Sequence, residues 1–527
     1  MPVTLSINGQ TAEAAPGALL FDCAQQLGVV VPTSCRKLGK CKECVVEIAE
    51  GADCLLPPTL FEQHLKPPFR LSCQSVVAAE DGQIRCHTMR RGRLRIESQA
   101  EGLPLAPGSR PLAPSCPYGL AMDLGTTTVV LRLYDLATGA LVADASFENP
   151  QRFGGSDVMA RIQYDTDHPG KLLRRTLAGY LTHAIEEFPV DPQSIGEMVV
   201  VGNSTMRDLF FRLSVHSIGQ SPYRSLTELE MTEGKRATTS LVETGRRCLL
   251  PIHPHARVYG APIISGHVGA DAAACMLAVD LAREDRLVAI MDIGTNTELI
   301  VGNRHKILAA SCPAGPAFEG GAITCGMPAL DGAIENVAID GEGSFHLDVI
   351  GGVAPQGICG SGLVALLSEL LRTGRMNDRG RFEYDIETVV LDPAGAVTFR
   401  ERDVNELAQA KGAHVAGLEI VLSNFGASFD DIEVFYLAGG FGRHMSVDAA
   451  MRIGLLPCIP KSRIVQTGNA AIEGASLALL SADRRQELEE LVRRVEHCRL
   501  ETHPRFFDFF VDGCLFQPFG SQARVAS

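Results

Sequence analysis

The chain has 527 residues, of which 46% are hydrophobic, and its formal net charge is −14. This length is enough for about two to four domains with large cores, and the negative charge disfavours a nucleic acid as the partner. No apolar run reaches the length of a membrane span, and the N-terminus lacks a basic and apolar signal sequence, so we expect no membrane association. Sixteen cysteines in such a chain favour the reducing cytoplasm over a disulfide framework.

Residues 1–90 have the pattern of a small β-rich domain. Apolar side chains alternate from Val3 to Ile7, as in a strand with one buried face, and Asn8-Gly9 follows as a tight turn. The pattern then predicts a helix at about 19–27 and another strand at 45–48.

Four cysteines in this domain have the spacing of iron-sulfur ligands. They follow the pattern C-x5-C-x2-C, with the fourth after a gap of 28 residues: Cys35, Cys41, Cys44 and Cys73. Cluster thiolates must converge, so three from one tight loop and one from a distant strand suit a two-iron, two-sulfur cluster. Gly39 would let backbone amides approach the sulfides. The spacing resembles that of adrenodoxin-type ferredoxins, which implies a β-grasp ferredoxin fold.

A zinc site and four unrelated thiols are the alternatives. Zinc sites more often combine C-x2-C with a second C-x2-C or with histidines, and the sequence has no such second pair. Three other cysteines of the domain lie outside the pattern and are expected to behave as small buried side chains: Cys23, Cys54 and Cys86.

The cysteine loop also carries four basic residues, Arg36, Lys37, Lys40 and Lys42. Two interpretations are open. The loop is either a solvated segment that offsets the cluster's charge or a docking face for an acidic electron-transfer partner.

Residues 91–117 have a different composition from the domain before them. Five prolines occur between 104 and 117, with no hydrophobic period. We expect a partly extended, semi-stiff linker.

Two similar hairpin motifs follow the linker. An apolar strand runs into Asp-x-Gly-Thr-Thr at 123–127, and the same arrangement returns as Asp-x-Gly-Thr-Asn at 292–296. Two copies about 170 residues apart indicate an internal repeat. Glycine permits the tight turn, amide and hydroxyl groups can bind phosphate oxygens, and the aspartates can hold hydrated Mg²⁺ or orient water. The predicted phosphate and magnesium residues are Asp123, Gly125, Thr126 and Thr127, with Asp292, Gly294, Thr295 and Asn296.

Two glycine-rich turns accompany the repeat. The buried strand at 434–438 ends in Gly439-Gly440-Phe441-Gly442, which resembles the adenosine-binding motif of the actin, hexokinase and heat-shock-70 superfamily. A second turn, Gly360-Ser361-Gly362, precedes an apolar helix whose N-terminus could meet a phosphate, although a purely structural turn explains it nearly as well.

The superfamily resemblance covers about residues 118–475 and implies a two-lobed, ribonuclease H-like duplicated ATPase domain. Within a domain of 118–527 we expect lobe I at about 118–280, lobe II at about 285–480 and a C-terminal return at 481–527. Gly439, Gly440 and Gly442 would contact adenosine.

The whole chain resembles the reductive activators of corrinoid proteins, in which a two-iron ferredoxin domain is fused to an actin-like ATPase domain. Further stretches similar to that family are 149–151, 155–158, 201–206, 312–321, 410–413 and 468–471. The resemblance implies an enzyme that uses ATP and Mg²⁺ to reduce Co(II) in a corrinoid protein of a methyltransferase system to Co(I). It also implies an upstream electron donor, and dimers occur among the relatives. Ala365 stands where the family pattern suggests an acidic residue.

Other functions compatible with these motifs are a small-molecule kinase of sugar-kinase type with a redox-regulatory ferredoxin domain, and an electron carrier that does not hydrolyse ATP. Activators of 2-hydroxyacyl-CoA dehydratases are related but lack this ferredoxin domain. The sequence does not name the corrinoid protein, the methyl donor, the electron donor or the ATP stoichiometry.

Several conspicuous residues carry weaker expectations. His253 and His255 are expected in a surface loop because the sequence suggests no third metal ligand nearby. Cys312, Cys325 and Cys359 are expected to be buried thiols. Residues 506–511 have the composition of a buried strand, and the family resemblance places Glu319 and Asn336 at the nucleotide cleft.

Overall fold

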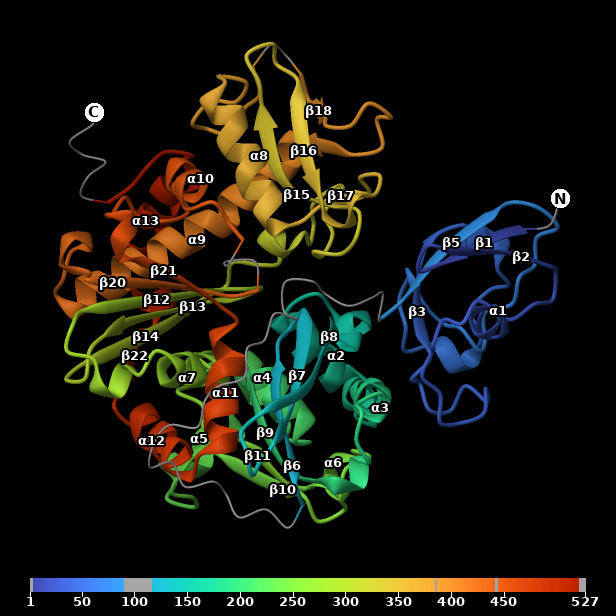
Figure 1. The fold of residues 1–527 in the computed structure, drawn as a ribbon, viewed down its shortest axis with the longest axis horizontal. Coiled ribbons are helices and arrows are strands. Elements are labelled where there is room, and N and C mark those ends of the chain that lie inside the picture. Colours follow the sequence, from blue (N-terminus) through green and yellow to red (C-terminus); the bar gives the residue numbers. More distant parts are fainter. Residues whose placement is uncertain (1–2, 90–115, 384–385, 441–443, 521–527) are drawn as a thin grey trace.

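The computed structural model describes residues 3–89, 116–383, 386–440 and 444–520. A small N-terminal domain lies beside a larger body made of two stacked lobes (Figure 1). The main sheets of these three parts have five, six and six strands. The predicted fold class, a β-grasp domain joined to a duplicated two-lobed body, is confirmed.

The N-terminal domain is a mixed sheet in the order β2-β1-β5-β3-β4, in which β1 and β5 pair in parallel. Alternate side chains of β1 are fully buried, as the sequence pattern predicts. The predicted helix and the strand after the cysteine loop are also confirmed. The elements are β1 (Val3–Ile7), β2 (Gln10–Ala14), α1 (Leu20–Gln26), β3 (Val45–Glu50), β4 (Phe69–Leu71) and β5 (Gln83–Thr88). Nearly all of the predicted linker, 91–117, lies outside the described residues.

Lobe I contains a sheet in the order β10-β11-β9-β6-β7-β8. β6, β7 and β8 form an antiparallel meander, and β9 pairs in parallel with β6. The strands are β6 (Tyr118–Leu124), β7 (Thr128–Asp135), β8 (Leu141–Glu148), β9 (Ile195–Gly202), β10 (Leu241–Thr244) and β11 (Arg257–Gly260). Its helices are α2 (Val158–Asp167), α3 (Leu172–Glu186), α4 (Ser204–Phe210), α5 (Leu226–Thr232), α6 (Gly245–Cys248) and α7 (Ala270–Ala278).

The sheet of lobe II has the order β21-β20-β12-β13-β14-β22, in which the first five strands repeat β11-β9-β6-β7-β8 and the sixth joins the opposite edge. Here β12, β13 and β14 form the meander, and β20 pairs in parallel with β12. The strands are β12 (Val288–Ile293), β13 (Thr297–Gly302), β14 (Ile307–Cys312), β20 (Val434–Ala438), β21 (Ile464–Gly468) and β22 (Val495–His497). Between β20 and β22 lie α10 (Val447–Arg452), α11 (Ala470–Leu480) and α12 (Ala482–Val492). The repeat predicted from the two hairpins is therefore a structural duplication.

A smaller substructure is inserted in lobe II between β14 and β20. It contains β15 (Ala333–Ile339), β16 (Phe345–Val349), β17 (Gly357–Ile358), α8 (Gly360–Arg372), β18 (Thr388–Val390) and β19 (Thr398–Arg400), and it leads into the long helix α9 (Glu401–Phe425). Ala365 lies in α8, buried in the apolar core of lobe II.

Helices α7 and α11 lie between the two lobes (Figure 1). They pack backbone to backbone, because a Cβ built at Gly474 would lie only 2.0 Å from the carbonyl oxygen of Ala274. Their buried residues form one apolar cluster with strands from both sheets. This contact fixes the floor of the space between the lobes.

The C-terminal segment 506–511 is not a strand, so that prediction is wrong. Phe506–Cys514 forms helix α13, which packs against α9. Phe506, Phe509 and Phe510 are partly buried against the lobe II core, at the i, i+3 and i+4 spacing of one helix face, whereas Phe507 is 72% exposed.

The N-terminal domain packs directly against lobe I, with the cysteine loop facing α3. Arg175 and Thr176 of α3 donate hydrogen bonds to the backbone carbonyls of Lys40 (3.1 Å) and Lys42 (2.9 Å). Beside them, Gly179 leaves space for Glu43, whose Cγ would lie 2.9 Å from a Cβ at that position. The buried apolar residues of the two parts form one cluster. Within the described residues, no helix is long and apolar enough to cross a membrane.

Candidate functional site

The four predicted cluster cysteines converge as two pairs. The thiols of Cys35 and Cys41 interact with each other, and so do those of Cys44 and Cys73. All but Cys35 are buried. Two pairs of thiolates are the donor set that two iron atoms bridged by sulfide require.

Backbone amides point at these sulfurs. The N–H groups of Leu38, Lys40 and Cys41 donate to Cys35, and that of Gly39 donates to Cys73. Gly39 has φ +68°, and a Cβ there would lie 3.0 Å from the ring of Phe61. The hydrogen bond from Cys44, supported by Gln74, lowers the pKa of the Cys73 thiol to about 6. The site therefore fits a group that carries negative charge on sulfur.

An ion pair holds the fourth cysteine in place. Buried Glu62 accepts hydrogen bonds from Arg70 Nε (2.8 Å) and from the amide of Leu71 (2.9 Å), two residues before Cys73. The positive charge of the cysteine loop is partly offset, because Lys37 forms an ion pair with Asp22. Lys42 donates a hydrogen bond to the carbonyl of Phe61. The side chains of Arg36 and Lys40 are exposed.

In the part of the chain that the structure describes, no three His, Cys, Asp or Glu side chains surround a position for a single metal ion. The arrangement of the four cysteines in pairs is consistent with this finding. His253 is partly exposed and His255 exposed, as predicted, and their ring centroids are 5.9 Å apart. Cys312 and Cys359 are buried as predicted, and Cys325 is partly exposed.

A pocket lies between the two lobes, and both hairpins open into it. Lobe I contributes Asp123, Gly125, Thr126 and Thr127, and lobe II contributes Asp292, Gly294, Thr295 and Asn296. Gly360, Gly439 and Gly440 also line the pocket. Ser361 lies in the first turn of α8 and places its hydroxyl 3.4 Å from the Cys359 thiol, whereas Gly442 lies outside the described residues.

Glycine is required at these turns by close backbone contacts. The Gly125 amide donates to the Thr128 carbonyl (2.9 Å), and a Cβ at Gly125 would lie 2.7 Å from that oxygen. Gly439, with φ +102°, lies against the second hairpin, where a Cβ would be 2.3 Å from the Ile293 carbonyl. The turn after β20 is thereby held against the hairpin of lobe II.

Two asparagines that the sequence reasoning did not assign connect the hairpins to helices. Asn203 caps α4 and donates to Thr126 Oγ1 (2.8 Å), and Asn469 caps α11 and donates to Asp123 Oδ2 (2.8 Å). Both follow the last glycine of a strand that is parallel to its neighbours. The repeated Gly-Asn at 202–203 and 468–469 is the sequence signal that could have identified them.

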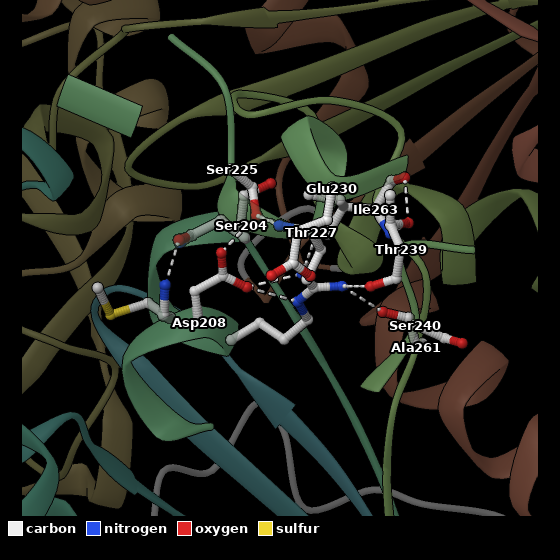
Figure 2. Close-up of polar contacts among 12 residues, drawn as sticks. Ser204, Asp208, Ser225, Thr227, Glu230, Thr239, Ser240, Ala261 and Ile263 are labelled. Atoms are coloured by element: carbon white, nitrogen blue, oxygen red, sulfur yellow. Dashed lines mark hydrogen bonds and ion pairs between the residues drawn. The ribbon is translucent and has the colours of Figure 1, made fainter. Parts of the chain in front are cut away.

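A buried network fixes α4 behind the first hairpin. The guanidinium of Arg207 donates to Asp208 (2.6 Å) and to the carbonyls of Thr239 and Ala261 (both 2.9 Å). Asp208, Thr239 and Ala261 converge on one point in Figure 2. Because every partner is buried, α4 and its cap Asn203 cannot shift without breaking this network.

Five carboxylates gather in the pocket, of which the sequence reasoning assigned only two to the metal and phosphate site. Burial raises the pKa of Asp123 to about 7, and burial together with Asp123 raises that of Asp271 to about 8. The pKa values of Asp292, Glu298 and Glu319 are also raised, mainly by burial. Mg²⁺ keeps several of its waters and needs only one or two carboxylates beside phosphate oxygens, so the aspartates of this set suit a hydrated Mg²⁺ although no three of these described side chains surround one position. Glu319 lines the pocket, as the resemblance implied, whereas Asn336 bonds Asp348 on β16.

Comparisons with known proteins agree with both sites. Three family models match the chain: the two-iron iron-sulfur binding domain at residues 3–78, the middle region of RACo at 118–284, and the C-terminal ASKHA domain of RACo at 286–523. A solved structure titled reductive activator for corrinoid, iron-sulfur protein superposes with a TM-score of 0.70 at 25% identity, covering 98% of each chain.

Curated relatives give the same result. The corrinoid activation enzyme RamQ of Eubacterium limosum is 33% identical over 429 residues, which are 76% of this chain and 70% of the relative. The [Co(II) methylated amine-specific corrinoid protein] reductase of Methanosarcina barkeri is 25% identical over 75% of this chain and 76% of its own length. The chain therefore belongs to the family of reductive activators of corrinoid proteins.

Proposed function

We propose that this protein reductively activates a corrinoid protein of a methyltransferase system: using ATP, it delivers one electron to a Co(II) corrinoid, which becomes Co(I) and can again accept a methyl group. The observation that carries the proposal is the presence, in one chain, of a ferredoxin site with two thiol pairs and a pocket between two duplicated lobes, with the ferredoxin domain seated on α3 of lobe I.

The roles of the residues are part of the proposal. Cys35, Cys41, Cys44 and Cys73 would hold a two-iron cluster, which supplies a one-electron carrier. The hairpin residues would bind the phosphates, and the glycines after β20 would contact the adenosine. The Mg²⁺ would be held by Asp123, Asp271 and Asp292. The N-terminus of α8 at Gly360 and Ser361 would face the phosphates. Residues 1–90 form the electron-transfer domain and 118–527 the ATPase domain.

ATP is needed because the electron moves uphill. Two-iron ferredoxins of the plant type have potentials of about −400 mV, and Co(I) corrinoids are stronger reductants than that. One electron raised by 100 mV costs about 2.3 kcal/mol. A difference of a few kcal/mol between two nucleotide-dependent arrangements of the lobes can offset such a gap.

We further infer that the protein works in the reducing cytoplasm, receives electrons from a separate donor and forms a homodimer. Sixteen cysteines without a disulfide support the location. Analytical ultracentrifugation tests the dimer.

The direct test uses the anaerobically purified protein with a Co(II) corrinoid protein and a chemical reductant. Absorbance should report Co(I) only with Mg-ATP, and Cys41→Ser and Asp292→Ala should each abolish it. ATP consumption that a small metabolite stimulates, with no change at cobalt, would instead identify a kinase.

A further inference from the structure

Glu319 joins the two phosphate hairpins. Its Oε2 accepts hydrogen bonds from the hydroxyl of Thr127 in lobe I (3.0 Å) and from that of Thr295 in lobe II (2.5 Å). The two hydroxyls are themselves 2.8 Å apart. One carboxylate oxygen thus lies at the point where the threonines of both lobes converge.

This point is where a phosphate oxygen would be bound. Thr295 is the threonine of the second Asp-x-Gly-Thr motif, Thr127 directly follows that of the first, and both line the pocket. A phosphate oxygen and a carboxylate oxygen are both anionic acceptors with similar hydrogen-bond lengths. Each threonine hydroxyl has a single proton to donate, so it cannot serve both anions.

Close backbone contacts hold the segment that carries Glu319 in place. Glu319 ends a short turn of 3₁₀ helix (Ala317–Glu319) after β14, and Gly320 follows with φ +84°. A Cβ at Gly320 would lie 2.7 Å from the Met327 amide, and one at Gly326 would lie 2.1 Å from the Gly320 carbonyl. Movement of the carboxylate therefore requires side-chain rotation only.

A cation stands on the lobe I side of Glu319. Arg161 of α2 is fully buried, and its positive charge lowers the pKa of the Glu319 carboxyl. Burial of Glu319 raises the same pKa and is the larger effect. Among the described residues, Nη2 of Arg161 has no hydrogen-bond partner. Buried guanidinium groups are normally paired, so this nitrogen offers a position that an anion can occupy.

We propose that Glu319 competes with the terminal phosphate of ATP for Thr127 and Thr295, and so makes the pocket discriminate ATP from ADP. ATP must displace the carboxylate from both threonines, whereas ADP leaves it in place. The inference rests on the proposed function in taking ATP as the ligand. Glu319 is then a specificity-determining residue that links the terminal phosphate to the contact between the lobes.

The test compares binding of Mg-ADP with that of the non-hydrolysable analogue Mg-AMPPNP by calorimetry. Glu319→Ala frees both hydroxyls and should tighten AMPPNP binding about tenfold, since two hydrogen bonds to a charged group no longer compete. ADP binding should change less than twofold. Glu319→Gln, which keeps the shape and loses the charge, should give a smaller change in the same direction and guards against a folding defect.

Glu298→Ala is the matched control, because Glu298 is a buried carboxylate of the same pocket that bonds Ser311 rather than the threonines. The ratio of AMPPNP to ADP affinity should stay near the parent value in this variant. An equal change of the ratio in both alanine variants would mean general charge repulsion and overturn the competition. Weaker AMPPNP binding in Glu319→Ala would also overturn it. If the parent protein bound neither nucleotide, the nucleotide site itself would be wrong, and the inference with it.

Discussion

At the scale of single residues, the cluster cysteines are distinguished from their neighbours by convergence. Cys44 pairs with Cys73 from a distant segment, whereas Cys54, in the same domain, lies beside Gly82 and outside both pairs. Spacing alone predicts these four cysteines as ligands, because three of them share one short loop, and the structure brings all four together as two pairs.

Cys44→Ser should therefore prevent stable cluster assembly, whereas Cys54→Ser should leave it intact. A serine oxygen is a harder and poorer ligand for iron than a thiolate. Iron content and visible absorbance of the anaerobically purified variants measure this. A cluster retained at the parent level in Cys44→Ser would contradict the assignment.

Asp271 leads to a prediction about pH. Its folded-state pKa of about 8 lies far above the unfolded value of about 3.9, so the folded carboxyl keeps its proton over a range where the unfolded one is ionised. Folding then takes up a proton, and the stability contributed by this group falls as pH rises from about 4 to 8. Asp271→Asn should remove this loss and, at pH 8 without Mg²⁺, raise the unfolding temperature by about 1 °C for each kcal/mol recovered in a chain of this length.

Thermal unfolding between pH 5 and 8 checks this prediction. Asp135→Asn, in an exposed turn, is the control and should follow the parent curve. Mg²⁺ with ADP should flatten the parent's pH dependence, because the cation favours the ionised carboxylates. Parallel curves for the parent and Asp271→Asn would argue against the shifted pKa.

The pocket carboxylates differ in how readily the sequence identifies them. Asp123 and Asp292 lie in local hairpins with a readable motif, and Glu298 faces Asp292 across the second hairpin, whereas Glu319 was identified only by the family resemblance and Asp271 not at all, because both come from segments outside the hairpins. Asp271 sits in an alanine-rich helix that shows no catalytic motif in isolation. Its role depends on which strands the helix follows, which spacing along the chain does not report.

At the scale of elements, α13 shows why the C-terminal prediction failed. The run of phenylalanines has high strand propensity, but tertiary contact with α9 selects the helix. Lys411 of α9 supports this choice: its buried amine donates to the carbonyls of Gly513 and Leu515, near the end of α13. Burial lowers the pKa of this amine to about 7.

Lys411→Met should loosen α13. The two carbonyls lose a donor, at a cost of about 1–3 kcal/mol, so amide hydrogen exchange in 506–514 should speed up about tenfold or more. Lys306→Met is the matched control, since Lys306 caps the carbonyls of Asn424 and Phe425 at the surface. Unchanged exchange in 506–514 would show that apolar packing alone holds the helix.

At the scale of the whole molecule, the ferredoxin domain is seated on α3 of lobe I. Gly179 is a position of close approach between the two parts, because a side chain there would meet Glu43. The sequence could predict both domains from their own motifs. It could not predict their contact, which depends on hydrogen bonds to backbone carbonyls and on apolar packing between residues far apart in the chain.

Gly179→Leu should separate the ferredoxin domain from lobe I. Small-angle scattering should then give a radius of gyration clearly above the parent value, which is about 24 Å for a compact chain of this length. Glu186→Leu, on the same helix two turns further and exposed, should match the parent. Equal scattering from both variants would show that α3 does not hold the domain.

The contact at α3 has a consequence for maturation. Arg175 and Thr176 bind carbonyls of the same loop that carries three cluster cysteines, so the loop shape that suits iron is the shape that α3 recognises. If iron binding and docking on α3 both stabilise the same loop conformation, each stabilises the other by the same free energy. Iron insertion should tighten the seating of the domain, and a seated domain should retain its iron longer against a chelator. Lobe I should thereby help the neighbouring domain to adopt the loop conformation that binds iron.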